Sequence, residues 1–309
     1  MMTVQPKIRI GTRSSPLALI QAHEARDRLM AAHGLSADAI SILTFTTTGD
    51  QIRDRPLSEI GGKGLFTKEL EEPLFAGVID MAVHSMKDMP AKPPKGLDIA
   101  ALLPREDPRD AFISFAAKTL HALPHGAKLG SSSVRRSAQA LRVRPDLASV
   151  PFRGNVQTRL KKLQDGIAHA TFLAVAGLNR LGLADKITCI MPMEDMLPSI
   201  AQGAIGIQIN AGDEATRKLL TPLNHQPTEY AITCERGFML ALDGSCRTPI
   251  AGHAMIENGI LKFRGEALTL DGEHVFSVTR EGSLADALRM GLEAGEDVKA
   301  RGGTLIAYP

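Results

Sequence analysis

A cysteine on a polar turn carries the most distinctive chemistry in this sequence. Cys246 lies in the stretch 243–249, where Asp-Gly forms a turn and a proline stops further helix. A thiol on such a loop, beside Arg247, is accessible and can be partly ionised. The loop alone favours an ordinary surface cysteine, so the other residues must decide. Cys189 and Cys234 lie in apolar or helical surroundings, and we interpret both as structural.

Basic side chains are concentrated in the middle of the chain. Residues 128–162 contain nine Lys or Arg and one acidic residue, although the net charge of the chain is only +2. Arg135 and Arg136 follow three serines at an expected helix start, and Arg153 and Arg159 flank the start of the next helix. Helix N-termini attract anions, and guanidinium groups bind carboxylates or phosphates through two parallel hydrogen bonds. The pattern indicates an anion site, with a solvated basic face as the alternative.

Three shorter stretches add polar groups. Residues 13–15 repeat the arginine-and-serine pattern at the first helix start, and residues 61–64 form a glycine-rich loop without Walker spacing. Asp88 and Lys87 directly follow an expected strand. An ionised carboxylate there could stabilise a cation or move a proton, whereas a purely structural Lys–Asp pair is the alternative. His84 is interpreted as structural, because no metal-binding histidine pattern surrounds it.

Composition and cysteine spacing exclude several classes. The 309 residues are 44% apolar and 23% charged, which indicates a soluble globular protein of more than one domain. Three widely spaced cysteines without a CxxC pattern argue against a disulfide framework and against a metal site. With two Tyr and no Trp, nucleic acid has a poor stacking platform. No signal-type or 18-residue apolar segment is present, so we expect a cytoplasmic protein with no membrane association.

Strand-like and helix-like segments alternate through the first two thirds of the chain. Expected strands are 7–11, 40–46, 80–84, 99–103, 128–130, 149–152, 171–174 and 203–209, the last returning to the first sheet. Expected helices begin at Pro16 and after the polar stretches named above. This order predicts α/β units with mainly parallel sheets. A polar stretch with two prolines, 104–110, is interpreted as a crossing between domains.

The last third follows a different pattern. A helix over 228–242 leads into the Cys246 loop, and three β-runs follow at 250–256, 260–270 and 274–279. Asn258-Gly259 and Asp271-Gly272 are strong hairpin signals between these runs. A closing helix is expected over 283–300. These features predict a small α+β domain with a three-stranded antiparallel sheet.

Many ordered segments together resemble the hydroxymethylbilane synthase family, also called porphobilinogen deaminase. The resemblance covers nearly the whole chain and is specific because the segments occur together. The segments are 12–19 (TRSSPLAL), 61–66 (GGKGLF), 82–90 (AVHSMKDMP), 105–112 (REDPRDAF), 131–136 (SSSVRR), 153–159 (RGNVQTR), 173–178 (LAVAGL), 202–206 (QGAIG) and the Cys246 loop.

The resemblance implies a domain organisation. Domain 1 would comprise residues 1–103 and 204–222, and domain 2 residues 104–203 with hinge segments at both ends. Both would resemble the halves of a type II periplasmic binding protein. Domain 3, residues 223–309, would carry the cysteine.

The resemblance also implies an activity and a cofactor. Four molecules of porphobilinogen, the small-molecule substrate, would be joined head to tail with loss of ammonia to give hydroxymethylbilane. The cofactor would be a dipyrromethane held by a thioether to Cys246. Asp88 would be the catalytic carboxylate, and the family suggests a monomer. Side chains implied for cofactor and substrate binding are Arg13, Ser15, Lys63, Phe66, Lys87, Ser133, Arg135, Arg136, Arg153, Arg159, Arg180 and Gln202, with Lys63 and Phe66 on a mobile loop.

Two other classes remain open at this point. A non-catalytic binding protein for anionic solutes, with the same two-lobed fold, would explain the arginines but not Cys246. A transferase with a cysteine nucleophile would need a base near Cys246, and the nearest histidine in sequence, His253, is not marked as a partner.

Overall fold

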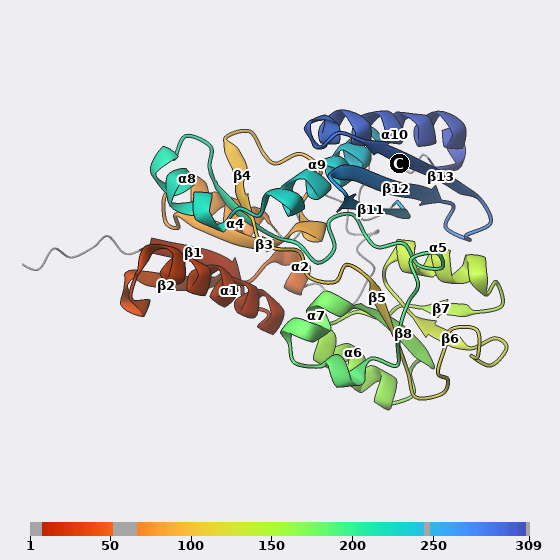
Figure 1. Cartoon of the computed structure of the whole chain (residues 1–309). Helices are drawn as coiled ribbons and strands as arrows, with labels where there is room; N and C mark the ends of the chain where they lie inside the picture. Colours follow the sequence, from red (N-terminus) through yellow and green to blue (C-terminus); the bar gives the residue numbers. More distant parts are fainter. Residues whose placement is uncertain (1–7, 52–66, 244–247, 307–309) are drawn as a thin grey trace, which may run out of the picture. The chain divides into compact units, whose positions relative to one another are not determined.

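The computed structural model describes residues 8–51, 67–243 and 248–306. These residues divide into two compact units (Figure 1). Unit 1 contains residues 8–51, 67–105 and 204–229, and unit 2 contains residues 106–203, 230–243 and 248–306. The chain therefore leaves unit 1 after Arg105 and returns to it at Ala204. The further division of unit 2 into two domains stays a prediction.

Unit 1 is built on a five-stranded sheet with the strand order β2-β1-β3-β10-β4. Its strands are β1 (Ile8–Arg13), β2 (Ile40–Phe45), β3 (Met81–Ser85), β4 (Leu97–Leu102) and β10 (Ile205–Asn210). Its helices are α1 (Pro16–His33), α2 (Thr48–Gln51), α4 (Lys68–Phe75) and α8 (Glu214–Leu220). Fully buried apolar side chains such as Ile10, Leu29 and Ile207 form the core between sheet and helices.

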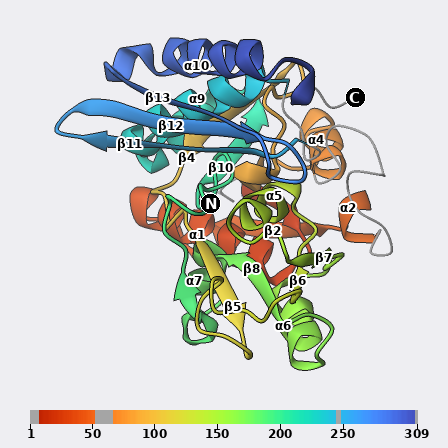
Figure 2. The same cartoon turned by 90° about the vertical axis from the view of Figure 1, so that its right-hand side faces the viewer.

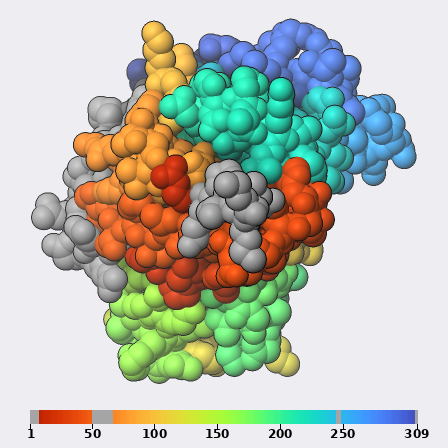
Figure 3. Space-filling view, turned by 90° about the vertical axis from the view of Figure 1, so that its left-hand side faces the viewer, coloured from red at the N-terminus to blue at the C-terminus, as the bar shows by residue number. Residues whose placement is uncertain are grey.

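The ends of α1 agree with its sequence signals. Ser15 accepts a hydrogen bond from the Ala18 backbone N–H, Pro16 occupies the first turn, and Gly34 ends the helix with φ of 63°. On the face drawn in Figure 3, the turquoise α8 lies beside orange residues of unit 1 that are distant in sequence. An ion pair of 3.1 Å between Arg217 and Asp98 joins α8 to β4.

Unit 2 contains a second five-stranded sheet, with the order β7-β6-β8-β5-β9. Its strands are β5 (Asp110–Ser114), β6 (Lys128–Gly130), β7 (Ala148–Val150), β8 (Ala170–Ala174) and β9 (Cys189–Ile190). Helices α5 (Val134–Val143), α6 (Val156–Gln164) and α7 (Val175–Arg180) accompany it. Sequence did not predict β5, β9, α2 or α8.

The expectation of mainly parallel sheets is wrong for half of the strand pairings. In unit 1, β1 pairs parallel with β2 and β3, whereas β10 pairs antiparallel with β3 and β4. In unit 2, β6 pairs parallel with β7 and β8, whereas β5 pairs antiparallel with β8 and β9. The path of the chain explains the antiparallel pairs. Strands β5 and β10 each follow a segment that comes from the other unit. They therefore lack the helical crossover that joins parallel neighbours. Both sheets are therefore mixed.

A third sheet in unit 2 confirms the predicted three-stranded antiparallel arrangement. It consists of β11 (Ile250–Glu257), β12 (Ile260–Leu268) and β13 (Val275–Gly282), and α10 (Ala287–Gly302) lies along it (Figure 2). Helix α9 (Gln226–Ala241) precedes β11. The predicted hairpin turn at Asn258-Gly259 has positive φ at both residues, 51° and 76°. Short 3-10 helices span Ala37–Ala39, Met86–Asp88, Ala184–Lys186, Thr221–Leu223, Leu284–Asp286 and Gly303–Leu305.

Glycines allow α9 and α10 to pack closely, and this gives a stability prediction. A Cβ at Gly291 would overlap the Cys234 carbonyl oxygen and approach the Phe238 nitrogen to 3.0 Å. These are backbone atoms, which cannot turn aside, so Gly291→Ala should lower the free energy of unfolding by about 1–3 kcal/mol. Urea denaturation measures this change. In Gly212→Ala, the new Cβ would meet one atom of the described chain within 4 Å, the Asn210 Oδ1 at 3.8 Å, so this control should unfold like the wild type. A Gly291 variant of unchanged or higher stability would contradict the packing argument, since alanine favours helices by about 1 kcal/mol.

Candidate functional site

In unit 1, an arginine and a carboxylate meet where two parallel strands end. Arg13 is the last residue of β1, and Asp88 closes the short 3-10 helix that follows β3. Because β1 and β3 are parallel neighbours, their carboxyl ends share one edge of the sheet, where ligands bind in open α/β folds. The Arg13 Nη1 lies 3.4 Å from the Asp88 Oδ2, with side-chain exposures of 20% and 32%. Both groups are therefore partly accessible to a ligand.

Two other predicted residues lie at the same edge. Ser15 begins α1, and its hydroxyl hydrogen is available for a ligand because the Oγ acts as an acceptor in the helix cap. Lys87 is half-buried between Met86 and Asp88. Unit 1 thus places Arg13, Ser15, Lys87 and Asp88, four of the predicted site residues, at one edge of its sheet.

Beneath this edge, His84 is a buried histidine of β3. Its Nε2 lies 3.1 Å from the Gln208 Oε1 on β10, which suits a neutral ring that donates its N–H. Burial lowers the pKa of His84 to about 4, and the nearby positive charge of Arg13 acts in the same direction, while the Gln208 contact opposes them. His84 thus supports the sheet edge as a neutral group, in agreement with its structural interpretation.

The low pKa of His84 predicts a pH-dependent stability. The unfolded chain should bind a proton at this ring near pH 6.5, whereas the folded chain resists protonation until about pH 4. The stability contributed by neutral His84 is therefore complete above pH 6.5 and is lost as the pH falls towards 4. The loss should approach about 1.4 kcal/mol per pH unit. Urea denaturation at pH 7.5 and pH 5 measures this change.

The control for this prediction separates His84 from the carboxylates that also titrate in acid. His84→Gln removes the titrating ring, so its stability should fall less between pH 7.5 and 5 than that of the wild type. His23 is exposed on α1, and His23→Gln should keep the wild-type slope. Equal slopes for the wild type and the His84 variant would refute the prediction.

In unit 2, the N-terminus of α5 carries the predicted serine and arginine pair. Ser133 caps the helix by accepting the Arg136 backbone N–H. Arg135 and Arg136 follow in the first turn, but they are only 5% and 7% exposed. A cavity of about 160 Å³ lies beside this end, and its lining is Ser131, Ser132, Ser133, Val134, Ser137, Pro151 and Leu270.

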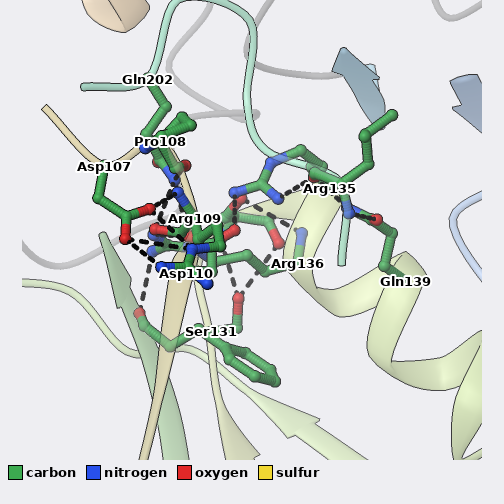
Figure 4. A network of polar contacts seen from close by, with 12 residues as sticks. Asp107, Pro108, Arg109, Asp110, Ser131, Arg135, Arg136, Gln139 and Gln202 are labelled. Atoms are coloured by element: carbon green, nitrogen blue, oxygen red, sulfur yellow. Dashed lines mark hydrogen bonds and ion pairs between the residues drawn. The ribbon is translucent and has the colours of Figure 1, made fainter. Parts of the chain in front are cut away.

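Both guanidinium groups turn towards Asp110, the first residue of β5 (Figure 4). The Arg136 Nε and Nη2 donate to the Asp110 Oδ1 at 3.0 and 2.6 Å, and the Arg135 Nη2 lies 2.8 Å from the Asp110 Oδ2. Burial alone would raise the pKa of Asp110, but the two arginines hold it well below its ordinary value. Burial lowers the pKa of Arg135, and Asp110 opposes this effect. Asp110 is a site residue that the sequence reasoning missed.

Gln202 joins the same network from the segment that returns to unit 1. Its Nε2 donates to the Pro108 carbonyl at 2.7 Å and lies 3.0 Å from the Asp110 Oδ1. The predicted residue Gln202 is therefore fixed next to the α5 arginines, and its side-chain amide is buried.

Three more predicted arginines are half-buried in unit 2. Arg153 precedes α6, and Arg159 in its first turn donates Nε–H to the Gly154 carbonyl at 2.9 Å. Arg180 ends α7 and donates to the Gly203 carbonyl at 3.2 Å. All three keep partly exposed side chains near helix ends, so they remain candidates for ligand carboxylates.

Three predicted site residues, Cys246, Lys63 and Phe66, lie outside the described residues. The other two cysteines have unfavourable surroundings for reaction. Burial raises the pKa of the Cys234 thiol to about 12, with a further contribution from Glu235, and burial also raises the pKa of Cys189. Within the described ranges, no cluster of three or more His, Cys, Asp or Glu is placed to hold a metal ion. No helix in these ranges is long and apolar enough to cross a membrane.

The fold defines an α/β protein of two units, each with arginine and serine side chains at helix and strand ends that suit carboxylates. Two family models match the chain: "Porphobilinogen deaminase, dipyromethane cofactor binding domain" over residues 8–218 and "Porphobilinogen deaminase, C-terminal domain" over residues 230–300. The porphobilinogen deaminase of Paracoccus denitrificans is 54% identical over 297 residues, which cover 96% of this chain and 95% of that protein. This chain belongs to the porphobilinogen deaminase family.

Similar solved structures are more distant. The periplasmic VFT2 domain of Bordetella pertussis BvgS has a TM-score of 0.43 and 16% identity, covering 71% of this chain and 87% of that domain. A periplasmic binding protein of Salmonella typhimurium with high arginine specificity has a TM-score of 0.40 and 14% identity, covering 70% and 90% of the two chains.

Proposed function

We propose that this chain is a hydroxymethylbilane synthase that uses the groups described above for the reaction of its family. It joins four porphobilinogen molecules head to tail, releases one ammonia at each condensation, and gives the linear tetrapyrrole hydroxymethylbilane. The observation that carries this proposal is the family match, which spans both units.

The donor set fits the dipyrromethane cofactor of this family. Each pyrrole bears an acetate and a propionate, so two linked rings present four carboxylates. In each unit, half-buried arginine or lysine side chains at helix and strand ends supply the positive charge and the N–H donors that carboxylates bind. When bound, the cofactor supplies the terminal pyrrole to which the first substrate is added.

Individual residues have distinct roles in this proposal. Arg13, Lys87, Arg153, Arg159 and Arg180 bind cofactor and substrate carboxylates through their guanidinium and ammonium groups. Ser15 and Ser133 donate hydroxyl hydrogens from the starts of α1 and α5. The remaining proposed binding residues are Arg135, Arg136, Gln202, Lys63 and Phe66.

Asp88 acts on the substrate. When the aminomethyl C–N bond of porphobilinogen breaks, ammonia leaves and the pyrrole becomes a cationic methylenepyrrolenine. A carboxylate close to the pyrrole N–H stabilises this charge and helps move the proton that is released when the new C–C bond forms. Arg13 holds the Asp88 side chain at the sheet edge.

Cys246 anchors the cofactor through a thioether and is not a nucleophile in each cycle. The described chain on either side suits such an anchor. Helix α9 ends at Ala241, and the Pro249 carbonyl accepts the Leu268 backbone N–H at 3.0 Å, so ordered elements precede and follow the position of Cys246 in the sequence. A non-catalytic binding protein would have no use for this thiol.

Intact mass spectrometry and ammonia release test the proposal on the full-length chain. The wild type should carry the added mass of two pyrrole units and release one ammonia for each porphobilinogen consumed. A bare protein mass together with no ammonia release would refute the proposed function. A bare mass with reversible porphobilinogen binding would instead favour a solute-binding protein.

A further inference from the structure

Asp110 is a fully buried carboxylate in contact with the proposed anion-binding groups Arg135 and Arg136. It is 0% exposed, and its two oxygens face different arginines. The Oδ1 accepts from Arg136, and the Oδ2 lies beside Arg135. One carboxylate therefore fixes both guanidinium groups relative to each other.

Backbone acceptors complete this fixation. The Arg135 Nη1 donates to the Leu197 carbonyl at 2.8 Å, and the Arg136 Nη1 donates to the Phe172 carbonyl at 2.9 Å. Neutral acceptors orient the arginines but do not offset their mutual repulsion. Among the described residues, Asp110 is the carboxylate that pairs with both guanidinium groups. Glu266 also favours the charge of Arg135, but it forms its own ion pair with Arg142 at 3.4 Å.

The charges of this cluster do not cancel. Two guanidinium groups and one carboxylate leave one net positive charge on side chains that are at most 8% exposed. A buried charge without a counter-ion is unfavourable. One ligand carboxylate would bring the net charge of the cluster to zero, and a second would make it negative.

We propose that Asp110 is a positioning residue that presents Arg135 and Arg136 as one site for a single ligand carboxylate. This inference rests on the proposed function, which supplies the pyrrole carboxylates. Gln202 extends the cluster to the returning segment, because its amide contacts both Pro108 and Asp110. Asp110 itself does not touch the ligand.

The test measures cofactor acquisition, not turnover. Full-length wild type and Asp110→Asn are produced in cells that make no porphobilinogen, and are then incubated with porphobilinogen at several concentrations. Intact mass spectrometry follows the rate at which the two-pyrrole adduct forms. Asparagine turns an N–H₂ donor towards one of the arginines, so Asp110→Asn should raise the half-saturating porphobilinogen concentration about tenfold or more, the equivalent of one charge-assisted hydrogen bond. Circular dichroism confirms that the variant is folded.

Asp107→Asn is the matched control. Asp107 pairs with Arg109 at 2.6 Å on the same segment, but that arginine is 42% exposed and not assigned to the ligand. This control should keep the wild-type half-saturation. An Asp110 variant that is folded and acquires the adduct as the wild type does would overturn the inference, while a wild-type chain without any adduct would overturn the proposed function as well.

A double-variant cycle separates positioning from simple loss of stability and remains informative if Asp110→Asn does not fold. In Asp110→Asn/Arg136→Met, one opposite charge is removed from each side, so the cluster keeps its net charge of one and should fold. If Asp110 acts through the arginines, the double variant should require no more than about threefold more porphobilinogen than Arg136→Met alone. A further tenfold increase in the double variant would show independent action and would overturn the inference.

Discussion

Asp88→Asn is expected to lower turnover by about a hundredfold or more while the cofactor adduct remains attached. Positioned acid–base groups contribute about 10²–10⁴ in rate, and stabilisation of a developing charge adds to this. Asparagine keeps the size of the side chain but removes the negative charge that would offset the cationic pyrrole. The measurement is the rate of ammonia release at saturating porphobilinogen, with intact mass spectrometry to show the adduct.

Asp80 offers a matched control in the same unit. It directly precedes β3, whereas Asp88 closely follows it, and Asp80 is likewise paired with an arginine, Arg9, at 2.6 Å. Asp80→Asn removes a carboxylate of the same kind from the opposite end of the strand and should leave turnover near the wild-type value. Unimpaired turnover in Asp88→Asn, or an equal loss in Asp80→Asn, would contradict the assignment.

At Asp88, the sequence pattern and the local structure agree. These polar residues directly follow a predicted strand. Their position could therefore be predicted once that strand and its parallel neighbour were predicted correctly. Sequence predicted β1 and β3 within a few residues, and their parallel pairing brings Arg13 to Asp88. Local signals of this kind, such as the Ser15 cap of α1, are readable because they depend on neighbouring residues alone.

The buried cluster around Asp110 could not be read in the same way. The polar residues 104–110 resemble a linker, and β5 begins with a charged residue. A buried carboxylate is compatible with a central strand only because Arg135 and Arg136, about twenty-five residues later in the chain, neutralise it. The sequence shows an excess of basic residues over 128–162. Asp110, which pairs with two of these arginines, lies outside that region. The excess positive charge is thus partly explained by the fold and partly by the proposed ligand.

Strand direction was the other feature that local pattern could not give. Alternating strands and helices indicate parallel neighbours, yet β10 follows a segment that comes from unit 2. Its direction depends on the path of the whole chain and not on its own residues. Strand β9 could not be predicted for a different reason. It is a two-residue edge strand, which is too short to show a periodic pattern of apolar residues.

Cys246→Ser is expected to abolish both the adduct and condensation. Serine is nearly isosteric, but its hydroxyl is a far weaker nucleophile than a thiolate and cannot form the thioether. The other thiols cannot substitute for it. Cys234 is completely buried, with its pKa raised to about 12, and burial also raises the pKa of Cys189. Neither provides a reactive thiolate near neutral pH.

The measurement is again the intact mass, combined with ammonia release over a long incubation. Cys189→Ser is the control, because Cys189 is partly accessible and its replacement should retain both the adduct and full turnover. If the Cys246 variant still carries two pyrrole units, the attachment site lies elsewhere. If it loses the adduct but condenses porphobilinogen at the wild-type rate, the covalent anchor is dispensable, and the arginines and serines must hold the growing chain by carboxylate binding alone.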